Sequence, residues 1–154
     1  MPPLGCDALT RAHPGVGAAY KGTVTNDDYR LTLTIPSGLT GWGAALYAPF
    51  HGFSIFLDGA CILFEVHIRV DIPEDVERPT AEPQKHVSIG GRAGFETIRT
   101  GTVHGVPFEN RIVSLELNRK NEQDEVTFTL ASRVAAAKKN NELFDRLVGS
   151  LLFY

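Results

Sequence analysis

The fold is decided by residues 52–70, which read GFSIFLDGACILFEVHIRV. Two strand-like runs, Gly52–Leu57 and Ala60–Val70, flank Asp58-Gly59, a dipeptide typical of a two-residue hairpin turn. Alternate residues of the second run are apolar: Ile62, Phe64, Val66, Ile68 and Val70. Because successive side chains of a strand point to opposite faces, this alternation predicts a central strand with one face in the core.

Runs rich in β-branched and aromatic residues predict further strands on both sides of this hairpin. Upstream, Tyr20–Val24 and Tyr29–Ile35 are separated by polar turn residues. Downstream, the expected strands are His86–Ile89, Ala93–Thr100, Arg111–Asn118 and Glu125–Arg133. Prolines and glycines in Pro36–Gly52, and prolines and acids in Asp71–Lys85, predict two irregular excursions from the sheet.

Near the C-terminus the apolar spacing changes from two residues to three and four. The residues that recur at this spacing are Leu143, Phe144, Leu147, Val148 and Leu151. They predict a short helix whose apolar stripe lies on the sheet, with Asn141 as its cap and Gly149 near its end. Residues 151–154 are expected to form a short final strand or a tail.

The order of these elements predicts an α+β fold. We expect an antiparallel β-sheet of about seven strands with a C-terminal α-helix packed on one face. Residues 1–19 are rich in Gly, Pro and Ala and are expected to form an irregular N-terminal arm. Residues 20–154 are expected to form a single α+β domain, because a chain of this size supports one core.

Composition excludes two classes of partner. The chain has 154 residues, 15 Lys and Arg against 18 Asp and Glu, and a formal net charge of -3. The basic residues are scattered, so nucleic acid is not expected as a partner. No apolar run approaches the roughly 18 residues that a membrane-spanning helix needs, so no transmembrane segment is expected.

The compartment stays open. The chain starts Met-Pro-Pro-Leu-Gly-Cys, without the basic start and apolar stretch of a secretory signal. The protein is therefore expected to be cytoplasmic, or periplasmic or secreted if a signal peptide was removed. Oligomeric state is open as well.

The two cysteines, Cys6 and Cys61, are too far apart in sequence for a metal or redox motif. Two interpretations remain. If the cysteines pair, closure of a loop of this length stabilises the fold by about 4 kcal/mol in the chain-entropy model. Otherwise Cys6 is a free thiol on the N-terminal arm and Cys61 is a small buried apolar residue.

Glu65, His67 and Arg69 form the first candidate site. Their spacing of two residues places a carboxylate, an imidazole and a guanidinium in a row on one face of the predicted strand. The carboxylate can then fix the tautomer of the imidazole, as general acid–base chemistry requires. The alternative is a solvated polar face or one covered by a helix.

Aromatic residues of the first excursion form the second candidate, a docking patch for a protein. Trp42, Tyr47, Phe50 and Phe53 belong to it, since aromatic side chains are favoured at the centres of interfaces. His51 lies at the entrance of the following strand, where a loop positions side chains for binding or catalysis. The alternatives are aromatics folded over the core and a histidine held by local hydrogen bonds.

No motif in the sequence predicts a metal, a cofactor or a catalytic triad. The five histidines are on separate segments and form no metal-binding spacing. The glycines around Trp42 lack the following Lys-Ser/Thr of a phosphate loop. No nucleophile elbow surrounds a serine, so we expect that the protein is not an enzyme.

Two stretches carry a family resemblance: YRLTLTIPSGL, residues 29–39, and ELFDRLVGSLLF, residues 142–153. With the strands between them, they resemble the PsbP-like family, which includes the extrinsic P protein of photosystem II and the Mog-type Ran-binding protein. This resemblance implies an antiparallel sheet flanked by helices and a binding or adaptor role. For bacterial members, it also implies a role as a chaperone or as an immunity protein of a secretion system. It carries over no functional residue.

The function expected first is a non-enzymatic protein-binding module that presents its two excursions on a rigid sheet. The resemblance implies an immunity or accessory protein of a bacterial secreted system. A second hypothesis is a small-ligand carrier with a pocket near Glu65, His67 and Arg69. A third is a weak hydrolase that uses His51.

Overall fold

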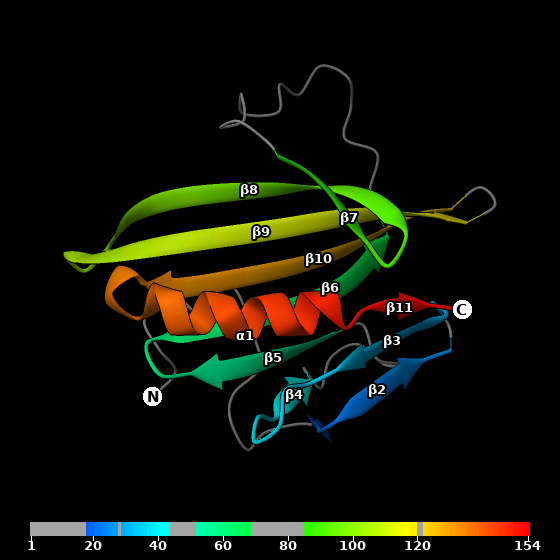
Figure 1. Ribbon diagram of the computed structural model, residues 1–154, viewed down its shortest axis with the longest axis horizontal. Helices are drawn as coiled ribbons and strands as arrows, with labels where there is room; N and C mark the ends of the chain where they lie inside the picture. Colours follow the sequence, from blue (N-terminus) through cyan, green and yellow to red (C-terminus); the bar gives the residue numbers. More distant parts are fainter. Residues whose placement is uncertain (1–17, 28, 44–51, 69–84, 120–121) are drawn as a thin grey trace.

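The computed structural model describes residues 18–27, 29–43, 52–68, 85–119 and 122–154 (Figure 1). In chain order the elements are β1 (Ala18–Tyr20), β2 (Thr23–Asn26), β3 (Leu31–Thr34), β4 (Gly41–Gly43), β5 (Gly52–Leu57), β6 (Ala60–Ile68), β7 (Lys85–Ile89), β8 (Arg92–Val103), β9 (Val106–Arg119), β10 (Glu122–Arg133), the 3-10 turn η1 (Val134–Ala136), α1 (Ala137–Gly149) and β11 (Leu152–Phe153).

The strands form two antiparallel sheets. The larger sheet has eight strands in the order β1-β4-β5-β6-β10-β9-β8-β7, and the smaller has three in the order β11-β3-β2. Helix α1 lies across the larger sheet and the smaller sheet lies beside it (Figure 1). The predicted α+β class, antiparallel pairing and C-terminal helix are confirmed. The strand count is wrong, because the larger sheet exceeds seven strands and a second sheet exists.

Gly22 explains part of this error. The sequence predicts one strand over Tyr20–Val24, but Gly22 has a φ of 65° and breaks it into β1 and β2. A residue in this left-handed conformation does not continue a strand. Strand β1 then pairs with β4 in the larger sheet, whereas β2 pairs with β3 in the smaller one.

Strand β4 lies inside the predicted first excursion. A Cβ atom on Gly41 would lie 2.8 Å from Cδ2 of Phe53, so this position requires glycine for close packing against a core ring. Gly41 and Gly43 therefore belong to a strand, so the prediction of an irregular excursion is wrong at these residues.

Three phenylalanine rings on adjacent strands form the centre of the core. Phe53 of β5 pairs with Phe64 of β6, which pairs with Phe128 of β10. The ring centroids of each pair are 5.2 Å apart. Helix α1 packs three side chains into the same cluster: Phe144, Leu147 and Val148. The predicted inward face of β6 is confirmed, since Ile62, Phe64 and Val66 are buried.

Hydrogen bonds attach both ends of α1 to the strands. Nδ2 of the buried Asn140 donates to Oγ of Ser132 over 3.1 Å, near the start of the helix. At the other end, Oγ of Ser150 accepts from N of Thr34 over 2.9 Å. These hydrogen bonds fix the helix over one part of the sheet.

Within the described ranges, no helix has the length and hydropathy that crossing a membrane requires.

Asn141 is not the helix cap that the sequence predicts. The helix begins at Ala137, and its N-cap residue Ala136 makes no side-chain cap hydrogen bond. The first turn, Ala-Lys-Lys-Asn, contributes no apolar stripe, so the spacing of apolar residues places the helix start too late. The predicted helix end at Gly149 and the final short strand are confirmed.

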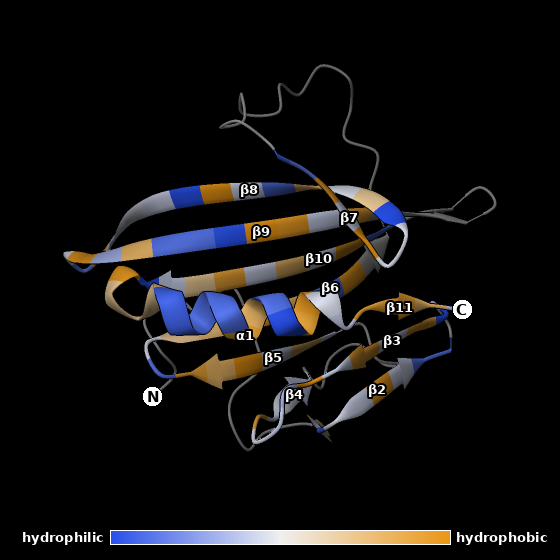
Figure 2. Ribbon diagram, viewed as in Figure 1, coloured by the Kyte–Doolittle hydropathy of each residue, from blue (hydrophilic) through white to orange (hydrophobic). Residues whose placement is uncertain are grey.

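Strands β8 and β9 are longer than the sequence predicts and form a hairpin that the sequence analysis does not predict. They are joined by His104-Gly105, whose φ values of 51° and 77° are those of a turn that matches strand twist. Figure 2 shows hydrophilic and hydrophobic residues alternating along β8, β9 and β10. The hairpin was missed because His-Gly is a weaker turn sequence than Asn-Gly or Asp-Gly.

The opposite face of the sheet carries a smaller cluster of Cys61, Ala131 and Phe56. Cys61 is fully buried and disulfide-bonded. Cys6, its predicted partner, lies outside the described residues. The interpretation of Cys61 as a plain apolar residue with a thiol is therefore wrong.

The row of three phenylalanine rings in the core leads to a stability prediction. Phe64→Ala should lower the free energy of unfolding by about 3–5 kcal/mol, because it leaves a cavity between two rings. Leu63→Ala, on the half-buried opposite face, is the control and should cost about 1–2 kcal/mol. Urea unfolding measures both. An unchanged midpoint for Phe64→Ala would refute the assigned register.

The disulfide generates a second prediction. Denatured protein without reductant should show no reactive thiol, and reduced protein should show two, since the chain has two cysteines. Titration with a thiol reagent measures this. Non-reducing electrophoresis at the mobility of a monomer is the control, and a disulfide-linked dimer would contradict pairing of Cys61 with Cys6 of the same chain.

Candidate functional site

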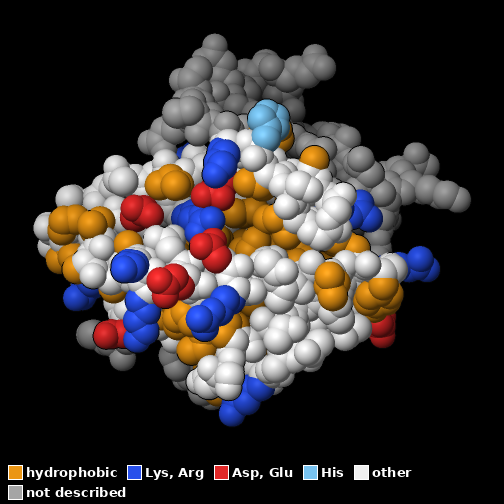
Figure 3. Space-filling view, in the orientation of Figure 1, with side chains coloured by type: hydrophobic (Ala, Val, Ile, Leu, Met, Phe, Trp, Pro, Cys, Tyr) orange, Lys and Arg blue, Asp and Glu red, His pale blue; other side chains and the backbone are white. Residues whose placement is uncertain are grey.

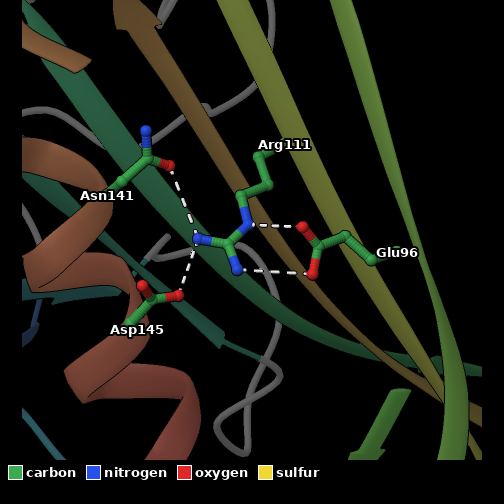
Figure 4. A network of polar contacts seen from close by, with 4 residues as sticks. All are labelled: Glu96, Arg111, Asn141 and Asp145. Atoms are coloured by element: carbon green, nitrogen blue, oxygen red, sulfur yellow. Dashed lines mark hydrogen bonds and ion pairs between the residues drawn. The ribbon is translucent and has the colours of Figure 1, made fainter. Parts of the chain in front are cut away.

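A cluster of polar side chains links the larger sheet to α1, and Arg111 of β9 lies at its centre (Figure 4). Nε of Arg111 donates to Oε1 of Glu96 over 2.8 Å, and Nη2 donates to Oε2 of Glu96 over 3.3 Å. Nη1 is 2.6 Å from Oδ1 of Asp145 and donates to Oδ1 of Asn141 over 3.4 Å. We call these four residues the Arg111 cluster.

Strand register and helix spacing bring these residues together. In the β8–β9 pairing, Glu96 is opposite Val113 and Ile98 is opposite Arg111, so Glu96 and Arg111 are diagonal neighbours on one face. Asn141 and Asp145 are four residues apart and therefore share one side of α1. The geometry thus depends on long-range register as much as on local sequence.

The electrostatics of the cluster keep Arg111 charged. Burial alone would lower the pKa of Arg111, but its hydrogen bonds to Glu96 and Asp145, and their negative charges, outweigh this, so its pKa is raised. The side chains of Arg111 and Glu96 are 18% and 11% exposed, whereas that of Asp145 is 60% exposed. The contact with Glu96 is therefore the stronger of the two, because water screens an exposed ion pair.

The chemistry open to this cluster is positioning. Cζ of Arg111 lies 5.0 Å from the centre of the Phe144 ring, so the guanidinium also contacts the helix through its face. A guanidinium with a raised pKa does not exchange protons near neutral pH. The cluster therefore holds α1 against β8 and β9. Among the described residues, no group of three or more His, Cys, Asp or Glu side chains could hold a metal ion.

Apolar side chains lie on both sides of the Arg111 cluster. Ile98, two residues beyond Glu96 on the same face, is 48% exposed. On the other side, Val87, Ile89 and Phe153 are partly buried at the margin of the core. Cζ of Arg92 lies 4.7 Å from the centre of the Phe153 ring. Figure 3 shows charged and hydrophobic side chains side by side on this face.

The sequence-predicted site residues lie elsewhere or outside the described residues. Glu65 is half-buried on β6 and faces away from α1, because Phe64 and Val66 point into the core. His67 follows on the same strand, opposite Glu125. Trp42 is half-buried on β4, opposite Ala19 and Ser54. Phe53 is buried in the core, so its assignment to an exposed docking patch is wrong. The remaining four lie outside the described residues: Tyr47, Phe50, His51 and Arg69. The row of Glu65, His67 and Arg69 stays a prediction.

Sequence reasoning missed the Arg111 cluster. The signal was present in part: Arg111 precedes Val113 and Leu115 at the spacing of an inward face, where a charged residue needs a partner. Asn141 and Asp145 were equally visible as a pair on one side of a helix. What the sequence lacked was the register that places Glu96 diagonal to Arg111.

Comparisons with known proteins concern the fold. No protein-family model and no curated protein matches the chain. A crystal structure from Bacteroides thetaiotaomicron matches with a TM-score of 0.58 and 7% identity, over 87% of this chain and 48% of that one. This chain therefore spans about half the length of that protein.

Solved structures of the predicted family also match. Cyanobacterial PsbP (CyanoP) from Synechocystis matches with a TM-score of 0.44 and 11% identity, over 94% of this chain and 98% of that one. The Ran-binding protein Mog1p from Saccharomyces cerevisiae matches with a TM-score of 0.48 and 8% identity, over 88% and 96%. The resemblance predicted from the sequence is confirmed, and at these identities it concerns the fold alone.

The Arg111 cluster generates a prediction for the stability of the helix contact. Arg111→Met should lower the free energy of unfolding by about 1–3 kcal/mol, because it leaves the nearly buried Glu96 carboxylate without its partner. Asp145→Asn, at the exposed side of the cluster, should cost less than about 1 kcal/mol. Chemical denaturation of both variants measures the difference. Equal effects would contradict the assigned order of the two contacts.

Proposed function

We propose that this protein is a non-enzymatic module that binds another protein. The observation that supports this proposal best is the exposed Ile98 beside the Arg111 cluster, on a sheet that strand pairing and α1 hold rigid. Protein interfaces combine apolar contact residues with a polar surround in this way. The finer role, an immunity or accessory protein of a bacterial secreted system, is proposed from the sequence resemblance.

The charges of the cluster favour binding over catalysis. Two carboxylates and one amide oxygen contact the Arg111 guanidinium, so the charged groups of the cluster are already paired within the molecule. A partner therefore gains more from apolar contact than from new ion pairs, since an exposed ion pair contributes little free energy. The Arg111 guanidinium, whose pKa is raised, keeps its charge near neutral pH and therefore serves to position other groups rather than to transfer protons.

Site-specific photo-crosslinking tests the proposed function. A variant with benzoylphenylalanine in place of Ile98 should crosslink to one protein from a lysate of the source organism, in a one-to-one ratio. A variant with benzoylphenylalanine in place of Thr23, an exposed residue of β2, should not. With the captured protein purified, Ile98→Asp should raise the Kd at least tenfold, because a charge replaces an apolar contact. Leu152→Asp is the matched control, since Leu152 is exposed on the other sheet and undergoes the same change.

Two outcomes would contradict this proposal. The first is unchanged affinity of the purified partner for Ile98→Asp. The second is the absence of any stoichiometric protein together with a rise in Tm on addition of a metabolite, which would favour the small-ligand carrier predicted from Glu65, His67 and Arg69.

A further inference from the structure

Strand β8 has a long edge that is paired on one side only. Five of its 12 residues, Arg92–Glu96, pair with β7, which leaves seven, Thr97–Val103. On their other side these seven pair with β9. In the part of the chain that the structure describes, no strand occupies the outer side of Thr97–Val103, and Ile98–Thr102 are each exposed.

The register identifies the backbone groups that this edge presents. Val103 and Val106 flank the two-residue turn, so they exchange both hydrogen bonds, and the bonds of β8 to β9 continue at every second residue back to Thr97. The N–H and C=O groups of Ile98, Thr100 and Thr102 therefore point outward. The β7–β8 hairpin gives the same assignment. Ile89 and Arg92 flank its turn and exchange hydrogen bonds, so every second residue of β8 from Arg92 onward directs its N–H and C=O groups toward the side on which β7 lies.

This edge lacks the features that usually prevent strand pairing. Exposed edges are normally short, or carry proline, bulges or several charges. The outermost strands of the two sheets are short, with three residues in β1, five in β7, two in β11 and four in β2. Thr97–Val103 contains no proline, has one charged side chain, Arg99, and is rich in β-branched residues.

We infer that the outer edge of Thr97–Val103 accepts an extended segment of the partner protein as an added strand. This inference rests on the proposed function and specifies how the partner binds. Main-chain hydrogen bonds to Ile98, Thr100 and Thr102 supply the pairing, as in other cases of strand addition. Over seven residues the added strand is roughly 23 Å long.

The side chains beside the edge define the chemistry of that segment. Ile98 projects toward the α1 side of the sheet, where an apolar side chain of the partner packs against it. Arg99 projects to the opposite face and is exposed, so an acidic side chain complements it there. The occupant is therefore an extended peptide that alternates apolar and acidic residues.

A second copy of this chain fits the edge less well. When two copies of Thr97–Val103 pair antiparallel about Thr100, Arg99 of one copy is diagonal to Arg99 of the other on the same face. Two positive charges this close together repel each other, which weakens the pairing. Moving the centre to Gly101 separates the arginines but shortens the paired segment. The observations therefore favour a different polypeptide with acidic residues.

A synthetic peptide tests the backbone contact directly. The probe is fluorescein-Thr-Val-Glu-Val-Glu-Val-Thr-amide, made in three forms: one without backbone methylation, and one N-methylated on each of the two alternate sets of amides. Fluorescence anisotropy should detect binding of the unmethylated peptide and of one methylated form, while the other methylated form should bind at least tenfold more weakly. Equal affinity of both methylated forms, or no binding by any form, would overturn the inference.

Thr100→Pro tests the same contact from the side of the protein. It removes an outward N–H that is not part of the pairing with β9, a position at which an edge strand tolerates proline. Its affinity for the peptide should fall at least tenfold, whereas Thr100→Ala, which keeps the N–H, should stay within twofold. Equal Tm values of the two variants confirm the fold, and hydrogen exchange in the wild-type protein provides a second readout. On peptide binding, the amides of Ile98, Thr100 and Thr102 should gain protection.

The outcomes separate this inference from the proposed function. If a purified partner binds Thr100→Pro as it binds the wild-type protein but loses affinity for Ile98→Asp, strand addition is overturned and the protein-binding module stands. If the peptide binds as expected but no protein partner exists, the edge stands and the proposed function fails. A dimer in light scattering that Thr100→Pro dissociates would overturn the choice of an acidic peptide in favour of a second copy.

Discussion

The packing of one row of phenylalanine rings under a short helix determines the rest of this structure. Phe53 and Phe64 come from one hairpin and Phe128 from a strand much later in the chain, and their contacts fix the register of β5, β6 and β10. A shift of one residue would turn every ring of one strand to the other face. Helix α1 covers this row with Phe144 and Leu147, so apolar burial and register depend on each other.

The helix is shorter than the long strands of the larger sheet. Strands β8, β9 and β10 have 12, 14 and 12 residues, whereas α1 has 13 residues, which at the smaller rise of a helix span less than half that length. Part of the sheet therefore extends beyond the helix, and the core under the helix ends there. The Arg111 cluster lies at that border, where a guanidinium contacts an aromatic ring on one side and carboxylates on the other.

Local sequence patterns predicted the elements that depend on neighbours in sequence. The β5–β6 hairpin followed from Asp58-Gly59 and the alternation of β6, and the helix from the spacing of Leu143, Phe144 and Leu147. The second sheet was not predictable in this way, because it needs the chain to break at Gly22 and the last residues to pair with β3. The Arg111 cluster was missed for the same reason. The side chains were visible, but their contacts depend on the register of one hairpin and its distance from a helix.

The pairing of charges within the Arg111 cluster bears on how a partner would bind to this face. Because Glu96 and Asp145 already hold the guanidinium, a new ion pair with it would have to replace existing contacts of similar strength. The backbone of Thr97–Val103 has no such internal partner on its outer side among the described residues. Hydrogen bonds formed there replace contacts with water rather than contacts within the protein, and each contributes a modest net free energy. A row of them along a rigid strand therefore gives orientation and length specificity, while Ile98 supplies the apolar contact that main-chain bonds lack.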